Sequence, residues 1–238
     1  MKHQRLMTLL PALPEQPEAP PAPLHEVLGY IEDSLEGSHS RAADALLQHL
    51  DCQNVESVLL EQESFDERAP RTREQIENNR DLPDYMAEFI ESWQSGGQTG
   101  AYPIKELWSG YYRHLTEVAQ DTGSSFLRDW STWEISLRNA LAETRADSTD
   151  MEVEDHTVER PHNEPNHEAL LLKLREASDP LARQRHLDGE RLATIEGLRG
   201  TDPFSLDAVL AYLASSLILD RWDLPETPDP QALLDEMK

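Results

Sequence analysis

The feature that most constrains the fold is the stretch 124–146, with the sequence SSFLRDWSTWEISLRNALAETRA. Its large apolar residues recur at steps of four, three, four and four, and they are Phe126, Trp130, Trp133, Leu137 and Leu141. Because an α-helix repeats every 3.6 residues, side chains at this spacing share one face. Two tryptophans on that face are a large apolar contribution to a core. The stretch therefore predicts a long amphipathic helix whose apolar face is part of the structural core.

Three polar residues of the same stretch are candidates for structural or interface roles: Glu134, Arg138 and Asn139. Glu134 precedes Arg138 by four residues, which is the favourable order for an ion pair on a helix. Ion pairs on helix surfaces are far commoner than active-site pairs, so we expect a surface pair here.

Apolar residues recur at helical spacing along most of the remaining chain, and no stretch alternates convincingly as a half-buried strand. Ser40 and Asn54 can each cap a helix, Thr72 with Gln75 fits a capping box, and Gly123 is a helix stop. The patterns predict helices at 24–35, 40–50, 54–59, 72–80, 83–93, 104–122, 124–146, 168–175, 181–198, 203–222 and 231–237.

These patterns predict an all-α fold of one or more antiparallel helical bundles, with essentially no sheet. An extended proline-rich leader is expected over 6–23, because proline fixes φ and removes a backbone donor. We expect a helical region over 1–146 and a second over 168–238 that packs on the first as one body. Between them, 147–167 is acidic and poor in apolar residues, which predicts a linker or surface insertion whose deletion hardly affects folding.

The charge of the chain limits its partners. Aspartate and glutamate number 46 against 21 lysines and arginines, for a formal net charge of −25. Binding to nucleic acid or anionic lipid needs a positive surface, so neither is expected as a direct ligand. A basic protein partner is compatible with this charge, and so is a simple role in solubility. The longest apolar run, 208–219, is shorter than the roughly 20 residues that span a bilayer, so no direct membrane span is predicted.

The search for catalytic motifs predicts no catalytic, cofactor-binding or metal-binding residue and no small-molecule substrate. Glycine-rich phosphate loops and the G-x-S-x-G elbow are absent from the sequence. The single cysteine, Cys52, has His49 three residues before it, and a buried structural thiol is the expectation. Two Glu-x-x-His patterns end at His162 and His167, near His156, but each contains a proline that opposes the helical geometry a di-metal site needs. We expect a polar acidic loop there.

A resemblance adds to these patterns. The segment 133–145, WEISLRNALAETR, resembles the acidic-Ile-x-x-x-Asn-x-x-x-x-x-Arg helix of the C-type (also called d-type) subunits of V-type and archaeal A-type rotary ATPases. The wider sequence is similar to an uncharacterised family encoded alongside bacterial V-type ATPases. Further stretches that carry the resemblance are a Leu-Pro leader near 10–14, LPDYMAEFIESW at 82–93, FLRDWSTWEISLRNAL at 126–141 and DPFSLDAVLAYLASSLILDRW at 202–222.

The resemblance implies a non-catalytic, all-helical subunit that couples the central stalk of a V-type ATPase to its membrane rotor ring during ion transport. It implies these ATPase subunits as partners and a cytoplasmic position, peripheral on the inner membrane through the complex. Two other functions stay open at this point: an assembly factor or regulator of the same ATPase, and an unrelated helical adaptor protein. A helical metalloenzyme using the histidines of 156–167 is a further class.

Overall fold

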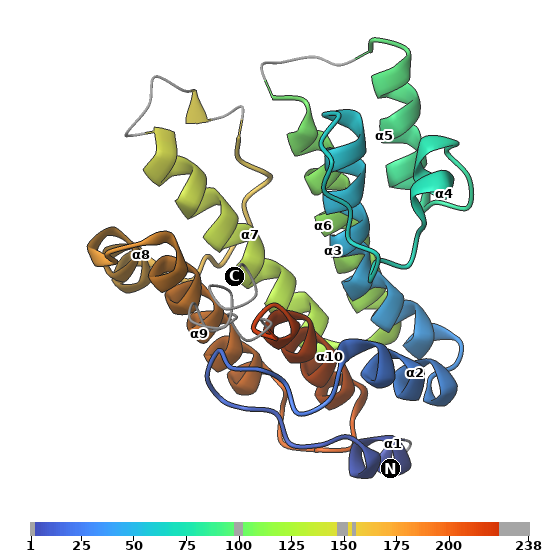
Figure 1. Cartoon of the computed structure of the whole chain (residues 1–238), viewed down its shortest axis with the longest axis vertical. Coiled ribbons are helices and arrows are strands. Elements are labelled where there is room, and N and C mark those ends of the chain that lie inside the picture. Colours follow the sequence, from blue (N-terminus) through green and yellow to red (C-terminus); the bar gives the residue numbers. More distant parts are fainter. Residues whose placement is uncertain (1–2, 98–101, 147–151, 154–155, 224–238) are drawn as a thin grey trace, which may run out of the picture.

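The predicted all-α fold is confirmed. The structure is a computed structural model that describes residues 3–97, 102–146, 152–153 and 156–223, and these residues contain helices and no strand (Figure 1). The helices are α1 (Gln4–Leu9), α2 (Leu24–Ser34), α3 (Ser38–Leu59), α4 (Arg73–Glu77), α5 (Asp84–Gln94), α6 (Ile104–Thr122), α7 (Ser125–Ala146), α8 (Glu168–Glu176), α9 (Pro180–Leu198) and α10 (Leu206–Asp220). The helix predicted over 231–237 lies outside the described residues.

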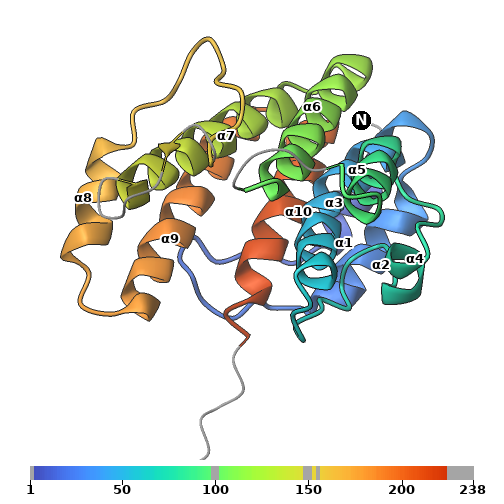
Figure 2. The same cartoon turned by 90° about the horizontal axis from the view of Figure 1, so that it is seen from above.

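Helices α6 and α7 form a helical hairpin joined at Gly123 (Figures 1 and 2). Gly123 has a φ of 69°, in the left-handed region that glycine adopts without a Cβ clash, and it ends α6. Ser124 then caps α7, because its hydroxyl accepts a hydrogen bond from the Leu127 N–H at 3.1 Å. The hydroxyls of Ser124 and Ser125 also donate to the Asp207 carboxylate at 2.5 and 2.6 Å, which ties the start of α7 to α10.

The apolar face of α7 packs as a ladder of rings. Phe126, Trp130 and Trp133 are stacked in sequence, with centroid separations of 6.3 and 5.4 Å and nearly parallel planes. These three rings and Leu137 are buried, and Leu141 is partly buried. Such burial of large side chains is the main favourable contribution to a helical core.

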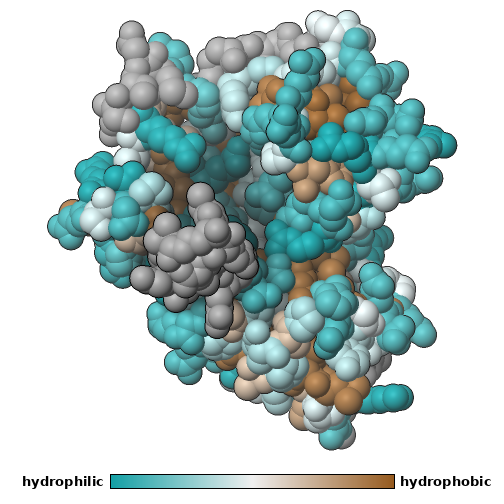
Figure 3. All heavy atoms as spheres, in the orientation of Figure 1, coloured by the Kyte–Doolittle hydropathy of each residue, from teal (hydrophilic) through white to brown (hydrophobic). Residues whose placement is uncertain are grey.

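The C-terminal helices pack directly on the N-terminal ones. Helix α10 contacts α2, α3, α7 and α9, while α3 lies along α6, and α8 packs on α9 (Figures 1 and 2). On the face shown in Figure 3, protruding side chains are mostly hydrophilic and apolar ones lie in the recesses between helices. No helix among the described residues combines the length and the apolar character needed to cross a membrane.

The predicted break in α3 is wrong. We expected separate helices capped by Ser40 and Asn54, whereas α3 begins at Ser38 and continues to Leu59. The Asn54 side chain is buried and closes a loop instead of capping a helix. Its Nδ2 donates to the Asp66 carbonyl oxygen at 2.9 Å, and its Oδ1 accepts from the Asp66 N–H at 2.7 Å. Because the Asn54 side chain bonds to this distant backbone group, it does not compete for the backbone hydrogen bonds of the helix around it.

The predicted extended leader is only partly observed. Residues 4–9 form helix α1, because Leu6 buries its side chain against the core. Residues 10–23 contain no helix, and they run across the C-terminal helices, where Tyr212 donates to the Pro11 carbonyl oxygen at 3.0 Å and Arg185 to that of Pro17 at 2.9 Å. The leader is therefore packed on the helical body.

Candidate functional site

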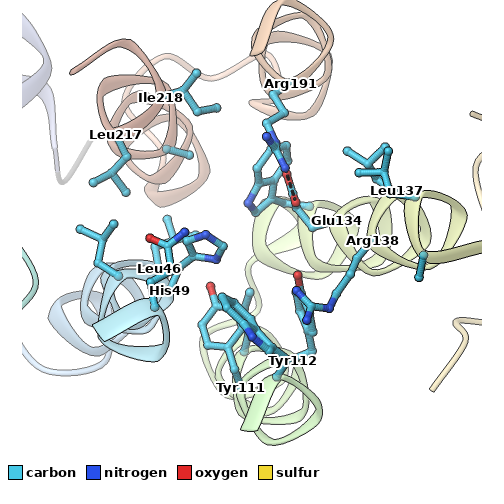
Figure 4. A pocket seen from close by; sticks show the side chains of 18 of the residues that line it. Leu46, His49, Tyr111, Tyr112, Glu134, Leu137, Arg138, Arg191, Leu217 and Ile218 are labelled. Carbon is cyan, nitrogen blue, oxygen red and sulfur yellow. Dashed lines mark hydrogen bonds and ion pairs between the residues drawn. The ribbon is translucent and has the colours of Figure 1, made fainter. Parts of the chain in front are cut away.

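The described residues line a cavity of about 460 Å³ at the centre of the helical body. Helices α3, α6, α7, α9 and α10 all contribute to its wall, and Figure 4 shows their side chains converging from these directions. The volume lies in the range of roughly 300–1,000 Å³ that is usual for pockets holding small organic molecules. The fold thus places a ligand-sized space beside α7, the helix that carries the aromatic stripe of 124–146.

Glu134 lies in this wall, but its partner is not the one expected from the sequence. Instead of pairing with Arg138 on the helix surface, its carboxylate accepts from Arg191 of α9, from Nε at 2.7 Å and from Nη2 at 3.2 Å (Figure 4). Spacing within one helix cannot reveal a partner on another helix, and a planar guanidinium fork gives the stronger, two-bonded contact. The pair therefore ties α7 to α9.

The Glu134–Arg191 pair controls the charge state of this carboxyl group. Burial alone raises the pKa of Glu134, and the adjacent Arg191 outweighs that effect, so the pKa lies below its usual value. Glu134 is consequently ionised at neutral pH and compensates one of the arginines in the wall.

Arg138 contacts the neighbouring helix α6. Its guanidinium carbon lies 4.6 Å from the centre of the Trp108 ring of α6, a cation–π contact. Its Nε is buried and has no hydrogen-bond partner among the described residues. A buried donor without an acceptor costs free energy, so Arg138 is an unsatisfied group in the wall.

Arginines dominate the charged part of the wall. The described lining residues include Arg68, Arg138, Arg145, Arg191 and Arg221, against the single carboxylate of Glu134. Behind the wall, buried Asp188 accepts from Arg221 at 3.0 Å and from the Trp222 indole N–H at 3.0 Å. Arg68 pairs with Asp66 at 2.5 Å and also with Asp220. The chain is strongly acidic overall, so this enrichment of arginine is local to the cavity.

Two tyrosines and a histidine also contribute to the polar part of the wall: Tyr111, Tyr112 and His49. Burial raises the pKa of both phenols above the usual value, so they stay protonated and can donate hydrogen bonds. Burial lowers the pKa of His49 to about 4, against a partial opposing effect of Glu134, so its ring is neutral at pH 7. The ring packs 5.1 Å from that of Trp108.

Asn139 lies on another side of α7 and is completely buried. Its Nδ2 donates to the Val158 carbonyl oxygen at 3.1 Å, and its Oδ1 accepts from the Val158 N–H at 2.9 Å. Ser136 of α7 also donates to the Pro165 carbonyl oxygen at 3.2 Å. Within the described residues, 156–167 is thus a surface insertion held against α7, not a linker free of the helical body.

The three histidines of this insertion have three separate environments. The ring of His156 lies 4.7 Å from that of Tyr102, His162 lines a shallower pocket with Trp133, and His167 is hydrogen-bonded to Ser136 at 3.1 Å. Among the described residues no group of three or more histidine, cysteine, aspartate and glutamate side chains is arranged to hold a metal ion. The Glu-x-x-His patterns therefore correspond to no clustered ligand set in this part of the chain.

Cys52 is fully buried, and its sulfur lies 3.6 Å from the Tyr85 hydroxyl. Burial raises the pKa of the thiol well above its usual range, so the reactive thiolate is suppressed at neutral pH. The ring of His49 packs instead with Trp108 and Tyr111, so the sequence neighbours Cys52 and His49 serve different parts of the core.

Sequence reasoning missed the cavity because its arginines come from segments far apart in the chain. Arg68 follows α3, Arg191 lies in α9, and Arg221 follows α10. One signal was present: Trp108 and Tyr111 stand on the apolar face predicted for α6, and adjacent polar-tipped aromatic residues often line sites that are partly polar.

Comparisons with known proteins give one family. A family model described as "Protein of unknown function (DUF2764)" matches residues 9–227. No curated protein and no solved structure matches the chain.

Proposed function

We propose that this chain, which belongs to the DUF2764 family of proteins of unknown function, is a non-catalytic subunit of a bacterial V-type rotary ATPase. In this proposal it acts like the C-type (d-type) subunits of rotary ATPases and couples the central stalk to the membrane rotor ring. It sits on the cytoplasmic side, attached to the inner membrane through the complex. Ion transport is then the activity of the whole complex, to which this chain contributes mechanical contact.

One observation supports the proposal most strongly. The polar residues of 133–145, the segment that resembles the rotary-ATPase subunits, form the hydrogen bonds that hold α7 to its neighbours. Glu134 binds Arg191 of α9, and Asn139 binds the backbone of Val158. The polar positions on which the resemblance is based therefore connect α7 to its neighbours in this fold. A part that transmits torque needs its helices held rigidly to one another, and such ties supply that rigidity.

The net charge of the chain indicates what kind of partner surface it would bind. A net charge of −25 favours a partner with a basic surface, because complementary charge steers association and suppresses wrong contacts. We therefore expect the face of the stalk or ring that contacts this chain to be rich in lysine and arginine. Such an attraction weakens as salt screens it, over a Debye length of about 10 Å at 0.1 M ionic strength.

The test is co-purification of the full-length tagged chain with ATPase subunits from membranes solubilised in mild detergent. We expect rotor-ring and central-stalk subunits to be retained at low salt and progressively lost as salt is raised. The matched control is the same tag on the chain in cells that lack the ATPase genes. Retention of none of these subunits at low salt would contradict the proposal. Retention only in incompletely assembled complexes would favour an assembly factor instead.

A further inference from the structure

The charged side chains that line the central cavity are mainly positive, whereas the whole protein has a large negative net charge. Among the residues that the structure describes, five of the chain's 21 lysines and arginines stand in its wall, together with one carboxylate, that of Glu134. Collecting like charges around a space is unfavourable unless opposite charge is supplied. Part of that opposite charge comes from the protein, since Arg191 pairs with Glu134, Arg221 with Asp188, and Arg68 with Asp66 and Asp220.

Arg138 is not neutralised by any of these carboxylates. No carboxylate among the described residues pairs with it, and its buried Nε lacks an acceptor. Its guanidinium is held in place over the Trp108 ring at 4.6 Å, so its position in the wall is fixed. A charged group that is fixed, partly desolvated and unsatisfied is ready to bind an anion at little further cost in conformational entropy.

The tyrosines supply neutral donors near the same place. Figure 4 shows Tyr112 beside Arg138, whereas Tyr111 lies on the side of His49, with ring centroids 5.9 Å apart. Within the part of the chain that the structure describes, neither tyrosine hydroxyl has a hydrogen-bond partner. A phenolic O–H beside a guanidinium is a suitable second donor for a carboxylate or phosphate oxygen.

The remaining wall indicates an aliphatic body for the ligand. Leu46, Leu137, Leu217 and Ile218 line the cavity from α3, α7 and α10 (Figure 4). The tryptophan rings of the wall are already occupied, because Trp108 is covered by Arg138 and Trp130 is stacked between Phe126 and Trp133. Neither tryptophan therefore offers a free face on which a planar base could stack, whereas an alkyl chain needs only apolar contact.

From this arrangement we infer that the cavity binds an amphiphilic organic anion, whose carboxylate or phosphate head contacts Arg138 and Tyr112 and whose alkyl body packs against the leucines. Arg138 is the main head-group residue, and Leu46, Leu137 and Leu217 are the main contacts of the body. The inference does not depend on the proposed role in a rotary ATPase, because it stands on the cavity alone.

The test is isothermal titration calorimetry of the full-length protein with four probes: decyl phosphate, decanoate, ADP and inorganic phosphate. We expect decyl phosphate, decanoate or both to bind with a stoichiometry of one, and inorganic phosphate to bind at least about tenfold more weakly, because it lacks the apolar body. Comparison of the first two probes tells whether the head is a phosphate or a carboxylate. Failure of both amphiphiles to bind at about 1 mM would overturn the inference. Tighter binding of ADP than of both amphiphiles would also overturn it.

Two variants assign the binding to the cavity. Arg138→Gln should weaken the amphiphile at least about tenfold, a typical loss for a charge-assisted hydrogen bond. Tyr112→Phe removes one oxygen and keeps the ring, so it should fold normally and weaken binding several-fold. The matched control is Arg175→Gln, an exposed arginine of α8 outside the cavity wall, which should bind as the unaltered protein does. Should Arg138→Gln fail to fold, Tyr112→Phe decides the question alone. Unchanged affinity in every folded cavity variant would place the ligand elsewhere and refute the inference.

Discussion

The substitution Asn139→Ala tests how the acidic insertion is held to the fold. Asn139 is completely buried, and both polar atoms of its amide bond to the backbone of Val158, at 2.9 and 3.1 Å. Each neutral hydrogen bond contributes about 0.5–1.5 kcal/mol to stability, and a buried backbone group left without a partner costs about 1–3 kcal/mol. Since water can enter the space and satisfy part of the lost bonding, we expect a total loss of about 2–4 kcal/mol.

The assay is urea unfolding at pH 7, followed by circular dichroism. The midpoint should fall with little change in the slope, because the substitution alters the folded contacts and not the surface exposed on unfolding. Asn163→Ala is the matched control, since Asn163 belongs to the same insertion but is exposed, and it should change stability by less than about 0.5 kcal/mol. An equal, small effect of the two substitutions would refute the reasoning.

The same contacts revise the expectation for deleting 148–166. The sequence alone predicts a deletion with hardly any effect on folding. In the structure the described residues of this segment include Val158, whose side chain is buried, and they hydrogen-bond to Ser136 and Asn139 of α7. Deletion should therefore destabilise the protein at least as much as Asn139→Ala does.

Three further predictions concern the core. Gly110→Ala should destabilise the protein by about 1–3 kcal/mol, because an added Cβ would lie 2.9 Å from Cδ2 of Tyr85. The matched control is Gly29→Ala, whose added Cβ meets nothing within 4 Å. In the same urea assay this control should be neutral or stabilising by up to about 1 kcal/mol. The lowered pKa of His49 means that the unfolded chain binds a proton which the folded chain does not, so this residue makes stability fall as the pH drops from 6.5 to about 4. His49→Leu should flatten that part of a plot of unfolding free energy against pH, and identical plots for the two proteins would contradict the assignment. Cys52 should react with a thiol reagent only after unfolding, and rapid labelling of the native protein would show that its burial is wrong.

Local signals predicted much of the helical framework. The capping box at Thr72 and Gln75 is formed in the structure, and Gly123 ends α6 as expected. The stripe from Phe126 to Leu137 also lies in the core. Each of these features depends on residues within about four positions of one another, where helix geometry alone determines which side chains meet.

Long-range partners could not be read from the same patterns. Asn54 has the sequence character of a helix cap, and only the fold brings the Asp66 backbone to it. Glu134 has a partner at the right helical spacing in Arg138, yet Arg191 is 57 residues away and forms the better bidentate contact. The cavity combines five helices, so its arginine-rich character exists only after the chain has folded.

The central claim, that this chain is a rotor-coupling component of the ATPase, is tested most directly by the stoichiometry of the active enzyme. The measurement is native mass spectrometry of the V-type ATPase purified from the organism that encodes the chain, selected for complexes that couple ATP hydrolysis to ion transport. The account predicts a fixed number of copies of this chain for each central stalk. Fully coupled complexes that lack the chain would contradict it.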